Sequence, residues 1–274
     1  MRRAAQITHA FIGQCTVLVL FAAAAGFILA GTTASPAQEV PVLVYHRFDP
    51  AHAGSTTVRT SVFEGQLIWL TEHGYRVVPL SEAVDMMRGR GSLEGPRNVV
   101  ITVDDGHRSV YSELFPLIQR YRIPVTLFIY PSAISHASYA LTWEQLHTMQ
   151  KSGLVDIESH TYWHPNFNRE RARLSPEAYQ KFVAFQLERS KSVLEEKFGI
   201  KVMMLAWPYG IYDAELEKAA SDAGYSEAFA YSGGPAHPGC DLLAIPRIPV
   251  SDADQGERFA ALLAGKQKST AGAE

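Results

Sequence analysis

The sequence predicts an α/β fold in which parallel strands alternate with covering helices and close into a barrel. Apolar strand-like runs alternate with amphipathic stretches from residue 41 onward. Four helical stretches end in a glycine that leads directly into a strand-like run, at Gly74, Gly153, Gly199 and Gly224. Glycine at that position supplies the left-handed turn that ends a helix. Seven or eight such units in one chain of 274 residues favour a single barrel domain over an open sheet.

The strand-like runs are nearly continuous in apolar residues, as expected for parallel strands buried on both faces. They cover 41–45, 75–78, 98–103, 123–130, 155–158 and 202–207, with a weaker pair near 228–231 and 242–247. Two helix starts carry capping signals. Thr142 with Gln145 forms a capping box, and Ser175 stands before a proline that suits the first helical position.

The first 37 residues predict a targeting segment rather than part of the fold. Arg2 and Arg3 precede an uncharged stretch at 11–30, and small residues follow up to Ala37. This pattern is typical of a signal peptide, and its length also suits an N-terminal membrane anchor. Both readings predict export to the periplasm, the extracellular space or the outer side of the inner membrane. The folded domain is expected at 38–265, with a flexible tail at 266–274.

Composition excludes one class of partner. The chain has 25 Lys and Arg against 28 Asp and Glu, a net charge of −3 and a pI near 6.4. Proteins that bind nucleic acid through bulk charge are basic, so no nucleic-acid partner is expected. Cys15 lies in the uncharged N-terminal stretch, which leaves Cys240 as the only cysteine of the predicted domain. We therefore expect no disulfide in the domain.

Two polar clusters follow strand-like runs, at the end where parallel α/β folds bind ligands. Asp104 and Asp105 come directly after the run at 98–103. One acid can bind a metal while the other acts as a base, although an ordinary Asp-Asp-Gly turn is the alternative. His160 and His164 follow the run at 155–158. One carboxylate and two imidazoles make a three-ligand site with open positions, as in catalytic zinc or ferrous sites.

A third cluster, Trp207-Pro208-Tyr209-Gly210, also follows a strand-like run. Its aromatic side chains can wall a sugar pocket, and ordinary packing at the barrel rim is the alternative for Trp207.

Together these clusters resemble the polysaccharide deacetylases of the NodB-homology group, carbohydrate esterase family 4. The segment 102–106 resembles that family's TFDDG motif with Val103 in place of Phe, and 160–165 matches its H-[S/T]-x-x-H-P motif. Pro208-Tyr209-Gly210 resembles the core of the third motif. The resemblance implies a distorted (β/α)7-type barrel that removes N-acetyl groups from a polysaccharide and releases acetate.

The same resemblance implies roles for individual residues. Asp104 is the expected general base, and the backbone N–H of Tyr209 is expected to bind the oxyanion. Asp105, His160 and His164 are expected to bind a divalent metal, with Zn²⁺ first and Co²⁺, Ni²⁺ or Fe²⁺ as alternatives. Pro208 and Tyr209, with Trp207, are expected to contact the polysaccharide.

Two departures from the family pattern leave roles open. Ala206 stands where the third motif usually begins with an Arg, and the usual Leu-x-His motif that supplies the general acid is absent after Leu242. Arg247 is the expected replacement that orients the base. His46, which follows the first strand-like run, is the expected general acid, ahead of His107 and His237.

Motif details are similar to the branch that deacetylates poly-β-1,6-N-acetylglucosamine, with peptidoglycan or a chitin-like polymer as other substrates. Two alternatives remain open at this point. One is an O-acetyl esterase acting on xylan or another glycan, and the other is a glycan-binding barrel with impaired catalysis.

Overall fold

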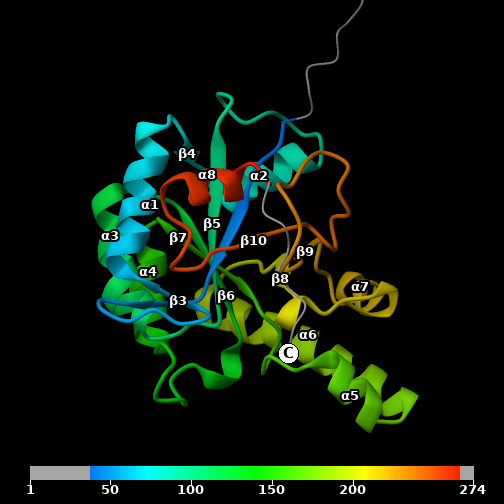
Figure 1. The fold of residues 1–274 in the computed structure, drawn as a ribbon. Coiled ribbons are helices and arrows are strands. Elements are labelled where there is room, and N and C mark those ends of the chain that lie inside the picture. The colour runs from blue at the N-terminus through cyan, green and yellow to red at the C-terminus, as the bar shows by residue number, and fades with distance from the viewer. Residues whose placement is uncertain (1–37, 266–274) are drawn as a thin grey trace, which may run out of the picture. The chain divides into compact units, whose positions relative to one another are not determined.

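The central sheet has eight parallel strands, seven of which form one continuous path that curls around a common interior (Figure 1). The structure is a computed structural model that describes residues 38–265. The predicted targeting segment at 1–37 and the predicted tail at 266–274 lie outside these residues. The strand order is β10-β1-β5-β6-β7-β8-β9. Their bounds are β1 Val42–Tyr45, β5 Asn98–Asp104, β6 Val125–Ile129, β7 Val155–Ser159, β8 Met204–Ala206, β9 Glu227–Phe229 and β10 Ile248–Pro249.

The segment 242–249 joins the two edges of this sheet. The backbone N–H of Ile245 donates to Ala228, which lies in β9, and three residues later Ile248 pairs with Leu43 of β1. The strand predicted at 242–247 is therefore wrong in its extent: residues 242–244 turn, Ile245 forms an isolated bridge, and the strand begins at Ile248. Pro246 lacks the N–H that a continuous ladder needs. The predicted barrel is thus present in a distorted form.

The predicted helix signals are confirmed. Thr142 and Gln145 form both halves of a capping box, and the Ser175 side chain accepts the N–H of Ala178. The four predicted glycines all have positive φ. The helices are α1 Thr60–Glu72, α2 Leu80–Met87, α3 Phe115–Tyr121, α4 Trp143–Lys151, α5 Phe167–Arg173, α6 Pro176–Phe198, α7 Ala214–Asp222 and α8 Gly256–Leu263.

The run predicted at 75–78 is confirmed as β4 Arg76–Val77, which pairs with β5 outside the main strand path. Two short features were not predicted. A π-helical turn at Val110–Leu114 precedes α3. Strands β2 Arg47–Asp49 and β3 Thr57–Arg59 form a separate parallel pair. Strand pairs of two or three residues contain too little sequence for a period to be recognised.

Side-chain alternation along β5 separates two apolar layers. Val99, Ile101 and Val103 belong to the larger core cluster, which includes buried residues of α1, α3, α4 and α6. Val100 belongs to a second cluster inside the barrel, with residues from β1, β6, β8 and β9 and from α2. Because successive strand side chains alternate, Thr102 and Asp104 are on the same side as Val100. The strand thus carries Asp104 on its interior face.

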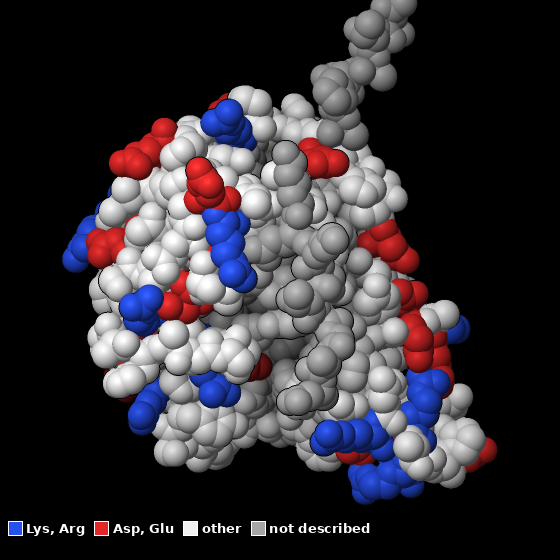
Figure 2. Space-filling model, in the orientation of Figure 1, with Lys and Arg blue, Asp and Glu red and all other residues white. Residues whose placement is uncertain are grey.

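The molecular surface carries both charge signs. On the face that Figure 2 shows, Lys and Arg are interspersed with Asp and Glu, and basic side chains gather over α5. Where described residues are visible on this face, they form no continuous basic surface of the kind that binds nucleic acid. Within residues 38–265, no helix combines the length and the apolar character that crossing a membrane requires.

Candidate active site

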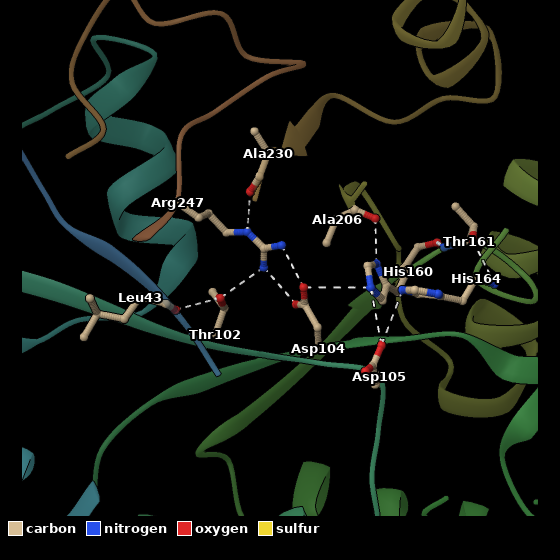
Figure 3. A network of polar contacts seen from close by, with 11 residues as sticks. Leu43, Thr102, Asp104, Asp105, His160, Thr161, His164, Ala206, Ala230 and Arg247 are labelled. Atoms are coloured by element: carbon tan, nitrogen blue, oxygen red, sulfur yellow. Dashed lines mark hydrogen bonds and ion pairs between the residues drawn. The ribbon is translucent and has the colours of Figure 1, made fainter. Parts of the chain in front are cut away.

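Asp104 ends β5 inside the barrel, where Arg247 contacts both of its carboxylate oxygens (Figure 3). Arg247 Nη1 lies 2.8 Å from Oδ1 and Nη2 lies 2.7 Å from Oδ2. Arg247 Nε donates to the Ala230 carbonyl at 2.8 Å, and its guanidinium lies 5.3 Å from the ring centroid of Phe128. Arg247 therefore has its planar group held on several sides, which fixes the carboxylate that it binds.

The ion pair with Arg247 determines the charge of Asp104. Burial alone would raise the pKa of the carboxyl group, but Arg247 and His160 outweigh it and lower the pKa to about 2. The sequence analysis suggested that Arg247 contacts the base, and the structure brings the two side chains together across 143 positions of the chain. Asp104 is consequently ionised across the neutral range and held in one orientation.

The second carboxylate, Asp105, faces the two histidines. Its Oδ1 atom lies 3.7 Å from His160 Nε2 and 3.5 Å from His164 Nε2. One ligand atom from each of the three residues lies within 4.8 Å of the others. Asp105 has φ of +74°, so the chain turns sharply between the two acids and directs them to different partners.

These three residues fit a small divalent cation. Zinc bonds of 2.0–2.2 Å in tetrahedral geometry place neighbouring ligand atoms about 3.4 Å apart, close to the two measured separations. His160 Nδ1 lies 2.7 Å from the Ala206 carbonyl and donates to it, which leaves Nε2 free to bind a metal. Burial lowers the pKa of His160 to about 3, so its imidazole is neutral. A neutral imidazole is the form that binds metals.

The histidine loop adopts an unusual backbone conformation. Thr161 and His164 both have φ of +63°, a region that non-glycine residues rarely occupy. The Thr161 hydroxyl accepts the N–H of His164 at 3.2 Å, which closes the loop on itself. Strained backbone persists where the surroundings hold it, and it is concentrated at functional sites.

The three histidines considered for the general acid have different positions. His46 directly follows β1, the strand beside β5, and its ring lies 5.6 Å from that of Tyr231. Burial lowers the pKa of His46, while the charges of Asp104 and Asp105 act in the opposite direction, which indicates that His46 lies near the two acids.

The other two candidates have local partners. His107 Nδ1 lies 2.8 Å from the Ser109 hydroxyl. His237 follows Ala236, which pairs with Val40 before β1, at the end of the barrel opposite Asp104. His237 is therefore remote from the acids.

The expectation that Trp207 and Pro208 wall a sugar pocket is wrong. Trp207 is 1% exposed, and its indole N–H donates to the Leu243 carbonyl at 2.8 Å. Pro208 is also buried. Tyr209 is 61% exposed, and its ring packs edge-on against that of His164 at 4.6 Å between centroids. Of the three residues, only Tyr209 is available to a substrate.

An aromatic pocket of about 510 Å³ lies beside the metal-ligand cluster. Its wall shares His164 with that cluster. Trp163, which is 48% exposed, and Tyr139 provide further aromatic surface. The lining residues are Tyr130, Ser132, Ala133, His136, Ala137, Tyr139, Trp163, His164 and Tyr209.

Sequence reasoning missed most of this pocket. Trp163 was detectable because it stands inside the histidine motif. Tyr130 and Tyr139, whose hydroxyls lie 3.1 Å apart, belong to a loop without a recognisable motif.

Comparisons with known proteins agree with this geometry. The family model described as polysaccharide deacetylase matches residues 93–228. YxkH of Bacillus subtilis is 29% identical over 231 residues, which are 84% of this chain and 78% of the relative. The poly-β-1,6-N-acetyl-D-glucosamine N-deacetylase of Staphylococcus aureus is 26% identical over 200 residues, 72% of this chain and 68% of the relative.

Solved structures share the fold. IcaB from Ammonifex degensii superposes with a TM-score of 0.73 at 27% identity, covering 83% of this chain and 97% of IcaB. The Streptococcus pyogenes deacetylase PplD, solved with acetate, also has a TM-score of 0.73, at 20% identity over 83% of this chain and 99% of PplD. The distorted barrel implied by the motifs is thereby confirmed. Motifs, fold and family model agree that the chain belongs to the polysaccharide deacetylase family of hydrolases.

Proposed function

We propose that this protein is an exported, metal-dependent enzyme that removes N-acetyl groups from an N-acetylglucosamine polymer and releases acetate. The observation that carries the proposal is the pairing of two kinds of group at one barrel mouth. A buried, ionised Asp104 lies within 3.8 Å of His160, and His160 belongs to the Asp105, His160 and His164 cluster. A base beside three metal ligands is an arrangement that supports metal-dependent amide hydrolysis at neutral pH.

Asp105, His160 and His164 would hold the metal. When bound there, a divalent cation supplies Lewis acidity, which polarises the acetamide carbonyl and makes a water more acidic. Zn²⁺ suits the nitrogen and oxygen donors best, and Co²⁺, Ni²⁺ or Fe²⁺ are compatible with the same set.

Asp104 would accept a proton from the attacking water, and Arg247 would keep Asp104 ionised and aimed at it. The backbone N–H of Tyr209 would donate to the oxyanion that forms on the acetamide oxygen. His46 would donate a proton to the leaving nitrogen, because it follows the strand beside the one that ends in Asp104. Loss of acetate then leaves a free amine on the sugar.

Poly-β-1,6-N-acetylglucosamine is the substrate that we propose first. The named activity of the Staphylococcus aureus relative and the 27% identity to IcaB support it. The aromatic pocket supports a sugar polymer more generally, because ring faces pack against the apolar faces of sugars. Export is supported by Arg2, Arg3 and the uncharged stretch at 11–30. An uncleaved segment would tether the enzyme to the membrane.

The test is acetate release by the purified protein from β-1,6- and β-1,4-linked N-acetylglucosamine oligomers, with chelator and with added Zn²⁺. We expect release that chelator abolishes, that Zn²⁺ restores, and that is faster on the β-1,6 polymer. Asp104→Asn should lower kcat by about 10²–10⁴-fold while zinc binding persists. Asp85→Asn, at an exposed acid of α2, is the matched control and should retain full activity.

Two results would redirect the proposal. Chelator-resistant acetate release would remove the metal from the mechanism. Zinc binding without acetate release from either oligomer would exclude the proposed substrates, and acetylated xylan would then test the esterase alternative.

A further inference from the structure

The loop that carries both histidine ligands lies on helix α6, and one buried side chain of that helix connects to it. The backbone N–H of Trp163 donates to Gln186 Oε1 at 3.0 Å. Trp163 immediately precedes His164, so this hydrogen bond lies one residue from a proposed metal ligand. Gln186 is 0% exposed and therefore has a fixed environment.

A second connection from α6 supports the start of the same loop. The Ser190 hydroxyl lies 2.8 Å from Ser159 Oγ, and Ser159 Oγ accepts the N–H of Thr161 at 3.2 Å. The Tyr225 hydroxyl also lies 2.8 Å from Ser159 Oγ. Polar contacts to α6 therefore flank the loop, with the contact through Ser190 near His160 and the contact through Gln186 near His164.

Only one end of the Gln186 amide is used. Its Nε2 atom is buried and has no hydrogen-bond partner among residues 38–265. A buried unpaired donor lowers stability, and a methionine of similar shape would fill the same space without that donor. Packing therefore does not account for an amide at this position, whereas the oxygen has a definite partner.

The conformation of the loop explains why such a partner matters. Thr161 and His164 both have φ of +63°, which a free loop of non-glycine residues would leave. The Trp163 N–H lies between these two residues, so holding it restricts the relaxation of both. We propose that Gln186 is a positioning residue: its side-chain oxygen holds the Trp163 amide so that His164 keeps the geometry that binds the metal. The inference rests on the metal site in the proposed function.

The test uses Gln186→Met in the full-length protein and measures metal binding without any substrate. Zinc affinity is obtained by competition with a chromophoric chelator, and the visible spectrum of the Co²⁺-loaded protein reports ligand geometry. Groups that orient metal ligands typically contribute 10–100-fold in affinity. We expect about tenfold weaker zinc binding and a changed cobalt spectrum, with the melting temperature of the metal-free protein unchanged or higher.

Gln186→Glu is the rescue variant, because a carboxyl oxygen can still accept the Trp163 N–H, and it should bind zinc within about twofold of wild type. Should Gln186→Met fail to fold, Gln186→Asn takes its place, since a side chain one methylene shorter withdraws the oxygen from Trp163. The expectation for zinc affinity is the same.

Gln66 of α1 offers a matched control. It is also a buried glutamine on a helix, but both ends of its amide are paired: Oε1 accepts the Tyr45 hydroxyl at 2.9 Å and Nε2 donates to the Asp254 carbonyl at 2.6 Å. Gln66→Met should lower the melting temperature of the metal-free protein and leave zinc affinity unchanged. Gln186→Met is thus expected to change zinc affinity without lowering the melting temperature, whereas Gln66→Met is expected to lower the melting temperature without changing zinc affinity.

Wild-type zinc affinity and an unchanged cobalt spectrum in Gln186→Met would overturn the positioning role while leaving the proposed metal site intact. Equal losses of zinc affinity in Gln66→Met and Gln186→Met would also overturn it, because the effect would then be one of general stability. A wild-type protein that binds neither metal would overturn the proposed metal site itself, and the inference with it.

Discussion

Replacing Arg247 with methionine tests the contact that distinguishes this site from the usual family pattern. Arg247 and Asp104 have side chains that are 0% and 2% exposed, and two hydrogen bonds of 2.8 and 2.7 Å join them. Methionine would fill part of the space and leave the carboxylate buried without its counter-charge. Breaking a buried ion pair in this way typically costs about 3–5 kcal/mol.

The lowered pKa of Asp104 provides an independent magnitude. In the folded protein the pKa is about 2, against an ordinary value of 3.8, because Arg247 and His160 outweigh the effect of burial. At 1.36 kcal/mol for each pKa unit, the favourable environment is worth about 2 kcal/mol. Since the folded pKa lies below the unfolded one, this stability is present above about pH 4 and is lost as the pH falls toward 2.

We therefore expect metal-free Arg247→Met to lose about 3 kcal/mol of unfolding free energy at pH 7, and the difference from wild type to narrow as the pH is lowered. Urea denaturation at pH 7 and at about pH 3 measures both the loss and its narrowing, because the wild-type contribution of the pair disappears only below about pH 4. The double variant Arg247→Met/Asp104→Asn should be more stable than Arg247→Met alone, because an amide replaces the unpaired charge. Arg59→Met is the control: Arg59 pairs with Asp252 at a more exposed position, where an ion pair contributes under about 1 kcal/mol.

Arg247→Met that stays within about 1 kcal/mol of wild type at pH 7 would refute the reasoning. A double variant no more stable than Arg247→Met would refute it as well, since the loss would then come from the missing arginine packing.

Four further predictions concern the site and the structure around it. His164→Ala should lose bound zinc while keeping its fold, as metal analysis and circular dichroism would show, and full zinc occupancy would exclude His164 as a ligand. Trp163→Ala should raise KM about tenfold with a smaller effect on kcat, while Trp163→Phe should keep most of the affinity for the polysaccharide. A loss of kcat with an unchanged KM would contradict a role of Trp163 in substrate binding. Burial raises the pKa of Glu158 to about 8, so wild-type stability should fall as the pH rises from about 4.5 to 8. Glu158→Gln should flatten that dependence in melting temperature, and an equal slope in both proteins would contradict the shift. Gly106→Ala should cost at least about 1 kcal/mol in urea denaturation, because Gly106 has φ of +73° and a Cβ there would lie 2.9 Å from Ile129 Cδ1; a neutral result would mean that the turn adapts.

Much of the fold was predictable because its signals are local. The runs that became β5, β6 and β7 are apolar and bounded by turn residues, and the caps of α4 and α6 depend on side chains within three positions. The strands that the sequence does not predict correctly are short or irregular. The sequence predicts one strand at 242–247, whereas the hydrogen bonds of this run go to the β9 side and pairing with β1 begins only at Ile248. Such a division depends on how the barrel closes, which no local pattern contains.

In the candidate site, too, some features were predictable from the sequence and others were not. The sequence by itself determined that Asp104 and Asp105 directly follow one apolar run and that His160 and His164 follow another within six positions. Only the tertiary structure decided which side chains meet them. Arg247 reaches Asp104 because ring closure brings Ile248 beside β1, the neighbour of β5.

The tertiary structure likewise decided which aromatic side chains are buried. Trp207 and Tyr209 stand two positions apart in one motif, yet Trp207 is in the core and Tyr209 is exposed. Tyr209 has φ of +57°, so the backbone turns between the two aromatic residues. The sequence leaves open whether Trp207 packs at the barrel rim or faces a substrate, and the carbonyl of Leu243, which the fold places against the indole, decides for packing. A motif thus specifies which chemical groups are present, whereas the closure of the barrel decides which of them face the substrate, because exposure is a property of packing between distant segments.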